Sequence, residues 1–179
     1  RSTDKQAIQK IFGKIHHGYN ETLIGDPSAA TDVSALKQHM PFMGEVLLGH
    51  LRYATFGKDG EENCHPRRRL NNWITRNLVV AGNFNMTNVD ELFDLLVSIG
   101  QHPKERSDTM TVLEKIGHFL DMENDRLVQI HKQLGYNDRQ ITGIMAEKMD
   151  VKSILTQSAV DFDGGYALAG MIGHGDAFV

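Results

Sequence analysis

The sequence has one cysteine, four prolines and no long apolar run, and these shortages exclude several kinds of protein. The single cysteine, Cys64, has no second cysteine for an internal disulfide, which is typical of a reducing cytosol. No apolar run approaches the roughly 18 residues of a membrane span, and no signal sequence precedes the first expected helix. We therefore expect a cytoplasmic protein with no membrane partner.

Basic residues are also too few for a nucleic-acid-binding surface. The 19 Lys and Arg residues are outnumbered by 23 Asp and Glu, giving a formal charge of −4, and this balance argues against a nucleic-acid partner. The short basic run 67–69 has no interleaved aromatic residues, so we expect it to lie in a solvated loop. At 179 residues with 40% apolar content, the chain fits one domain with a real core.

Both ends predict that the parent chain is longer than 179 residues. The chain opens in polar residues that lead directly into a helix, and residues 176–179 form an apolar strand with no turn after them. We therefore expect the 179 residues to be an internal piece of a longer chain.

Hydrophobic periodicity predicts an α+β protein. Expected helices cover 4–17, 32–39 (capped by Thr31), a segment from Asn88 to Gly100, a segment from Ser107 or Asp108 to about 120, 123–134, 138–149 and 151–158. Expected strands are 45–53, a hairpin of 73–75 with 77–81, and a hairpin of 166–172 with 176–179. Residues 18–30 and 57–69 are expected to be loops. Strands near both ends with helices between them favour layered α+β rather than βαβ.

Arg52 is the first candidate binding residue. It ends the expected strand 45–53, where packing can hold a guanidinium while its planar fork points into a cleft and binds a carboxylate. Thr55 and Gly57 follow with a hydroxyl and a flexible turn. A surface ion pair is the alternative for Arg52.

Asn83 and Asp108 are the next candidates. Asn83 ends a strand with a side-chain amide that can donate to an oxyanion, an interaction worth about 3 kcal/mol; a turn-forming Asn is the rival reading. Asp108 opens a helix and can bind an ammonium group, although Ser and Asp at that position also cap helices.

The segment 62–66 holds adjacent Cys64 and His65. Metal ligation is not expected, because the chain has no second cysteine and the spacing does not suit zinc. Adjacent side chains on an extended chain point to opposite sides, so Cys64 is not expected to be a nucleophile activated by His65. His65 is expected to contact a carboxylate or to order the loop.

Taken together, these motifs resemble the glutaminase domain of class II glutamine amidotransferases, which are N-terminal nucleophile hydrolases. Residues 52–57 resemble the Arg-aromatic-small-Thr-x-Gly block, and 62–66 the loop after it. Residues 83–88 and 107–109 resemble Asn-Gly-Asn-Leu-Thr-Asn and Ser-Asp-Thr, and 164–168 the later Gly-small-Tyr-Ser-Leu strand. The match covers about 49–179. Among subfamilies, Tyr53 and residues 85–88 look most like amidophosphoribosyltransferase.

The resemblance implies a role for each matched residue. Arg52 binds the glutamine carboxylate, with Thr55 and His65 beside the substrate, and Asp108 binds the α-amino group. Asn83 donates to the oxyanion, and the second donor is the backbone N–H of Phe84, where the family has glycine. The Cβ of Phe84 restricts the dihedrals available to that donor.

The resemblance also implies a four-layer αββα antiparallel sandwich, of which this chain is an incomplete part. The nucleophile would be an N-terminal cysteine ahead of Arg1, with its own amine as base. No cofactor is expected in this segment. A missing synthase domain would pass ammonia to phosphoribosyl pyrophosphate with Mg²⁺ in purine synthesis, and a homo-oligomer is expected.

Two further readings stay open at this point. A non-catalytic glutamine-sensing or scaffold domain on the same fold is the alternative, and a hydrolase using Cys64 is a distant third.

Overall fold

The computed structural model describes residues 1–51, 60–61 and 64–179, which belong to two compact units, Arg1–His65 and Pro66–Val179. Within these ranges, no helix combines the length and the apolar character that a bilayer crossing requires.

Unit 1 contains the first helices. They are α1 (Ala7–Gly25), the 3-10 helix η1 (Pro27–Ala30) and α2 (Val33–His39). The expected loop at 18–30 is wrong, because α1 runs through Gly18 and ends at Gly25. Its C-cap is Asp26, whose extended backbone (φ −142°) suits the residue before Pro27. The N-cap of α2 is Asp32 rather than Thr31, since its carboxylate accepts the Ala35 N–H at 3.0 Å.

The expected strand 45–53 is wrong over residues 45–51, which have no regular secondary structure. The side chains of Val46, Leu47 and Leu51 are exposed. A strand is stabilised by cross-strand pairing and by burial of one face, and the described part of unit 1 contains no strand to pair with this segment. Residues 52 and 53 lie outside the described residues.

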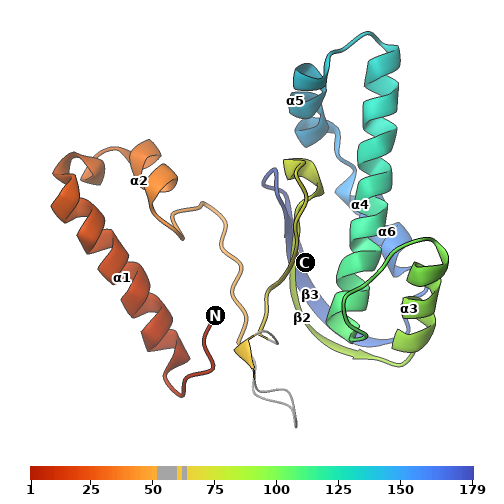
Figure 1. Cartoon of the computed structure of the whole chain (residues 1–179), viewed down its shortest axis with the longest axis horizontal. Helices are drawn as coiled ribbons and strands as arrows, with labels where there is room; N and C mark the ends of the chain where they lie inside the picture. Colours follow the sequence, from red (N-terminus) through yellow and green to blue (C-terminus); the bar gives the residue numbers. More distant parts are fainter. Residues whose placement is uncertain (52–59, 62–63) are drawn as a thin grey trace. The chain divides into compact units, whose positions relative to one another are not determined.

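Unit 2 is built on a four-stranded antiparallel sheet with the order β1-β2-β3-β4. The strands are β1 (Arg67–Arg69), β2 (Leu78–Met86), β3 (Gly164–Ile172) and β4 (Ala177–Phe178). Figure 1 shows β2 and β3 side by side, with α4 along one face of the sheet. The predicted hairpin of β3 with β4 is confirmed.

Two expectations before β2 are wrong. Arg67–Arg69 is strand β1 rather than a loop, and it pairs with Leu78–Val80. Residues 73–75 are not a strand, because the connection contains the 3-10 helix η3 (Ile74–Arg76). The Asn77 side chain closes this connection by accepting the Asn71 N–H at 2.6 Å.

The helices of unit 2 are α3 (Val89–Ser98), α4 (Asp108–Gln133), α5 (Asp138–Lys148) and α6 (Val151–Ala159). Helix α4 is continuous where the sequence predicted two helices, because its buried stripe passes from Leu120 through Asn124 to Leu127 with no Gly or Pro between them. The predicted Asn137 cap of α5 is confirmed as a capping box with Gln140.

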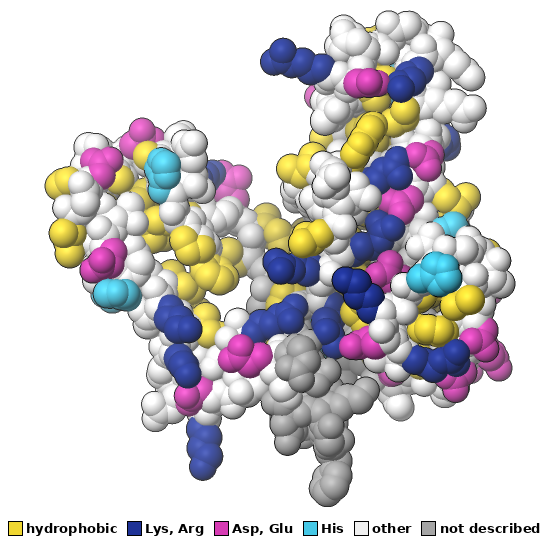
Figure 2. Space-filling model, viewed as in Figure 1, with side chains coloured by type: hydrophobic (Ala, Val, Ile, Leu, Met, Phe, Trp, Pro, Cys, Tyr) yellow, Lys and Arg dark blue, Asp and Glu magenta, His cyan; other side chains and the backbone are white. Residues whose placement is uncertain are grey.

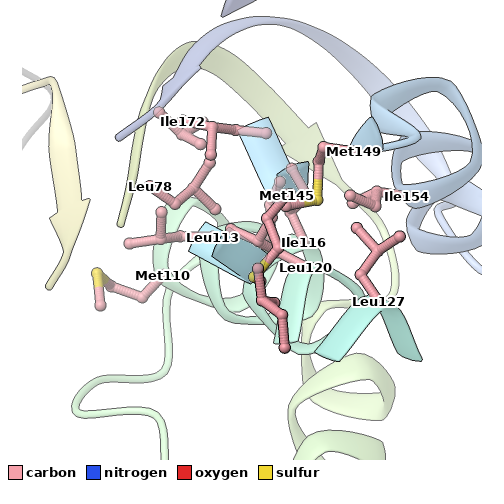
Figure 3. Packing of buried hydrophobic residues seen from close by; sticks show 13 residues of the cluster. Leu78, Met110, Leu113, Ile116, Leu120, Leu127, Met145, Met149, Ile154 and Ile172 are labelled. Atoms are coloured by element: carbon pink, nitrogen blue, oxygen red, sulfur yellow. The ribbon is translucent and has the colours of Figure 1, made fainter. Parts of the chain in front are cut away.

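The core of unit 2 lies between α4 and the sheet (Figure 3). Leu78 and Val80 of β2 are fully buried against Leu113 and Leu120 of α4. Helices α5 and α6 extend the same core with Ile141, Met145 and Ile154. The buried side chain of Asn124 has hydrogen-bond partners for both of its polar atoms. Its Oδ1 accepts the Thr75 hydroxyl at 2.6 Å, and its Nδ2 donates to the Leu120 carbonyl at 2.7 Å.

An ion-pair network fastens β1 to α4. Arg69 donates to Glu114 at 3.1 Å and to both carboxylate oxygens of Asp121. Burial lowers the pKa of the Arg69 guanidinium, but hydrogen bonds and charge from Asp121 and Glu114 outweigh it, and the net pKa lies above its ordinary value. Figure 2 shows basic and acidic side chains interspersed over the surface of this unit. Arg69 therefore faces acidic side chains of its own chain, and Arg67 pairs with Glu105 at 2.8 Å.

The described residues thus give an α+β unit with one antiparallel sheet. The four-layer αββα sandwich stays a prediction.

Candidate functional site

Strand β2 presents alternate side chains to two different environments. Leu78 and Val80 face α4, and Phe84 follows them on that face, partly buried against the core. Asn83 lies on the opposite face and is exposed, directly across from Ala167 of β3. Side chains alternate along a strand, so the Asn83 side chain and the Phe84 ring lie on opposite faces of β2. The candidate oxyanion donors are the Asn83 side-chain amide and the Phe84 backbone N–H.

The hydrogen-bond pattern fixes where the Phe84 N–H points. The Thr87 N–H donates to the Asp163 carbonyl at 3.0 Å, and the Gly173 N–H to the Asn77 carbonyl at 2.9 Å. Bonded and non-bonded pairs alternate along an antiparallel ladder, and the β2–β3 register is continuous between these ends. The amides of the even-numbered β2 residues, Phe84 included, therefore point away from β3.

Phe84 fits this strand without backbone strain. Among the described non-glycine residues, only Phe42 has a positive φ, so Phe84 has the ordinary backbone of a strand. Its ring lies against Gly82, where an added Cβ would be 2.7 Å from the ring and 2.7 Å from the Ala167 carbonyl oxygen. The Phe84 ring thus occupies the space that a side chain at position 82 would need, which is why residue 82 is glycine.

Asp108 lies at the same edge of β2. Its Oδ2 accepts the N–H of Met86 at 3.4 Å, an even-numbered amide that points away from β3. Ser107 takes the cap of α4, since its hydroxyl accepts the Met110 N–H and donates to Glu105 at 2.9 Å. The Asp108 carboxylate is therefore directed to the strand rather than used as the helix cap, and in the described part of the chain its Oδ1 has no hydrogen-bond partner.

The two motifs are thereby brought together in one unit. Asn83 precedes Met86 by three residues, about 10 Å along a strand. A side-chain amide, a backbone N–H and a carboxylate lie along one end of β2, and this arrangement offers donors to an oxyanion and an acceptor to an ammonium group.

Thr87 and Asn88 hold this strand end, a role that the sequence did not reveal. The Thr87 hydroxyl donates to the Asp163 carboxylate at 2.5 Å. The Asn88 amide donates to the Asp161 carbonyl at 2.8 Å and accepts the Asp163 N–H at 3.3 Å. Asn88 stands at the N-cap position of α3 as expected, but its side chain makes no cap hydrogen bond. The hydrogen-bond partners of Thr87 and Asn88 lie more than 70 residues away in the sequence, so local spacing gives no indication of these contacts.

The other candidates belong to unit 1 or fall outside the described residues. Arg52 and Thr55 fall outside the described residues. His65 belongs to unit 1, where it is 8% exposed and its ring lies 4.6 Å from that of His50. The Cys64 thiol lies 3.9 Å from the Gly60 carbonyl oxygen. No group of three or more His, Cys, Asp or Glu residues in the described ranges has a geometry that would hold a metal ion.

Comparison with known proteins points to glutamine-dependent enzymes. The chain is 35% identical over 77 residues to a glutamine–fructose-6-phosphate aminotransferase of Sulfurisphaera tokodaii. It is 31% identical over 90 residues to the enzyme of that name from Streptococcus pneumoniae, and 31% over 106 residues to a putative one from Saccharomyces cerevisiae. These proteins are class II glutamine amidotransferases, the class that the motifs indicated.

These similarities cover only parts of the proteins compared. They span 43%, 50% and 59% of this chain, but 12%, 14% and 13% of the respective relatives. The chain thus matches about an eighth of the length of these relatives. No family model matches, and no solved structure matches.

Proposed function

We propose that this chain is part of the glutamine-hydrolysing half of an amidotransferase, which releases ammonia from the side-chain amide of glutamine. The observation that carries the proposal is the Met86–Asp108 hydrogen bond, because it joins the strand of Asn83 to the start of α4. Similarity to proteins named for glutamine-dependent amination supports it.

Each polar group has a distinct role in this proposal. The Asn83 amide and the Phe84 N–H stabilise the negative charge that develops on the amide oxygen of glutamine when a thiolate attacks it. One such donor is worth about 3 kcal/mol. Asp108 binds the α-ammonium group. Arg52 binds the α-carboxylate, with Thr55 and His65 beside the substrate, as the motif resemblance implies.

The nucleophile is not among these residues. The resemblance assigns it to an N-terminal cysteine ahead of Arg1, whose thiolate would form a thioester and expel ammonia; water would then release glutamate. This assignment and the four-layer αββα fold remain predictions of the proposal.

Alanine replacement of Asn83 tests the oxyanion role. In the full-length protein we expect Asn83→Ala to lower kcat for glutamate release 100- to 1,000-fold, with KM changed less than about threefold because the carboxylate and ammonium contacts remain. Asn85→Ala is the matched control, since Asn85 is exposed on the same face of β2. Equal losses in both variants would mean that the strand itself is damaged, and would contradict the role.

Asp108→Asn tests the ammonium contact. We expect KM for glutamine to rise about 10-fold or more, because a charge-assisted hydrogen bond worth about 1.5–3 kcal/mol is lost. Steady-state kinetics with glutamine measures this change. An unchanged KM would remove Asp108 from the binding site.

The ammonia acceptor is a second question. The names of the relatives favour fructose 6-phosphate, whereas the motif resemblance favoured phosphoribosyl pyrophosphate in purine synthesis, for which these relatives give no support. The full-length protein, supplied with glutamine and either fructose 6-phosphate or phosphoribosyl pyrophosphate with Mg²⁺, separates the two. The true acceptor is the one whose aminated product accumulates in step with glutamate.

A non-catalytic glutamine-binding domain is the alternative function. Calorimetric titration of the full-length protein with glutamine distinguishes it from the enzyme: heat of binding without glutamate release in a following assay would favour this alternative over hydrolysis.

A further inference from the structure

Lys115 is a buried cation close to the candidate site. It lies in α4, and its side chain is only 3% exposed. Its ammonium nitrogen is 2.7 Å from the carboxylate of Asp161 and 5.2 Å from the centre of the Phe162 ring. Burying a charge is costly unless it is paired, so this pair is a strong local constraint on where residue 161 can lie.

The segment held by Lys115 also holds the end of β2. Asp161 accepts the Asn88 amide through its backbone carbonyl at 2.8 Å. Two residues later, Asp163 accepts both the N–H and the hydroxyl of Thr87. The segment 161–163 therefore connects Lys115 to the turn that follows Met86.

These contacts form a closed circuit through α4. Asp108 and Lys115 are seven residues apart on that helix, which is about two turns and places them on the same side. From Asp108 the circuit passes to Met86, along the chain to Asn88, across to Asp161 and back to Lys115. We infer that Lys115 is a positioning residue, which fixes the end of β2 against the start of α4 and so sets the distance between Asn83 and Asp108.

The circuit has one weak member and one strong member. At 3.4 Å, the Met86–Asp108 bond is long for an N–H···O hydrogen bond. Alone it would hold the end of β2 only weakly against α4. The Lys115–Asp161 pair is short and shielded from solvent on the lysine side. Without Lys115, that long bond would be the polar contact left, among the described residues, between α4 and this end of the strand, while the apolar packing of Phe84 and Phe162 would remain.

Lys115→Met tests the inference, because Met retains an apolar stem and removes only the charge and the donors. We expect the backbone amides of Met86 and Thr87 to exchange with deuterium at least 10-fold faster in the full-length variant. The amides of Val79 and Ala81, at the centre of β2, should keep their rates. Lys132→Met is the matched control, because Lys132 is on the same helix and its pair with Asp138 is exposed at both ends; it should change none of these amides.

Kinetics gives a second readout, which rests on the proposed function. KM for glutamine should rise at least fivefold in Lys115→Met, and Lys115→Arg, which keeps the charge, should recover part of the loss. Faster exchange at all four amides, or at none, would overturn the positioning role. If the unaltered protein released no glutamate, the proposed function would fail. Faster exchange at Met86 and Thr87 alone in Lys115→Met would still establish the circuit.

Discussion

Asn83 and Phe84, the two proposed oxyanion donors, are neighbours that would serve a site in different ways. The Asn83 side chain lies on the exposed face of β2, whereas the Phe84 N–H points away from β3 and the Phe84 ring packs toward α4. Phe84 has no positive φ in this structure, so its Cβ brings no backbone strain to the strand. What Phe84 requires instead is the glycine at 82.

Cys64 allows a prediction at the residue scale. We expect Cys64→Ser to change glutamate release by the full-length protein less than about threefold, because the thiol contacts a carbonyl oxygen and has no base assigned to it. Initial rates at saturating glutamine measure the effect. A loss of 100-fold or more would make Cys64 the nucleophile and would revive the reading as a Cys hydrolase.

The residues of the site differ in how far the sequence revealed them. Asn83 and Asp108 are candidates because each belongs to a short motif whose residue types suit a chemical role. Lys115, Asp161 and Asp163 were not found, because their importance lies in contacts with residues 46 to 76 positions away. Local spacing carries information about faces and caps, but none about such pairs.

At the scale of elements, predictions that depend on local sequence are correct, and those that depend on contacts between distant residues are wrong. The start of α4 at Ser107 and the capping box of α5 are local, and both are confirmed. The strand expected at 45–53 is wrong over its described part, because apolar residues alone do not supply a pairing partner. Strand β1 was missed because a run of three arginines is typical of a solvated loop, and the sequence does not show that Arg69 pairs with Glu114 and Asp121 of α4.

Gly164 gives a prediction at this scale. Its φ is +114°, and an added Cβ would lie 2.3 Å from the Asn85 carbonyl oxygen. We expect Gly164→Ala to destabilise the protein by about 2 kcal/mol or more, since backbone strain of this kind alone costs about 1–3 kcal/mol. The melting temperature should then fall by roughly 4–8 °C.

Gly143→Ala is the control for this experiment. Gly143 lies inside α5 with open space around it, and Ala is a better helix former than Gly by up to about 1 kcal/mol. Its melting temperature should therefore stay the same or rise. Equal destabilisation by both changes would show that the close approach of β3 to β2 at Gly164 is not what limits substitution.

For the whole molecule, the division into two units is the main feature. Every member of the buried hydrophobic cluster lies in Pro66–Val179, whereas α1 and α2 of unit 1 have no fully buried residue. Unit 2 therefore carries a core of its own, and the sheet end with Asn83 and Asp108 belongs to it.

We accordingly expect a fragment of residues 66–179 to fold without unit 1. Urea unfolding followed by circular dichroism should be a single sigmoidal transition. The backbone amides of Leu113, Ile116 and Leu120 should be the slowest to exchange, because these residues lie at the centre of the core. A gradual, non-cooperative loss of helix signal would show that unit 1 is needed for the fold.

The alternation along β2 has a consequence for how this gene can change. Deleting or inserting one codon between Val80 and Met86 would exchange the two faces of the strand beyond that point and reverse the direction of each amide. A shifted Asn83 would enter the core, and the amide opposite Asp108 would turn toward β3. Point substitutions in this stretch alter one contact at a time, but a change of length alters all of them together. Related sequences should therefore vary in length in the loops around β2 and keep this strand free of insertions and deletions.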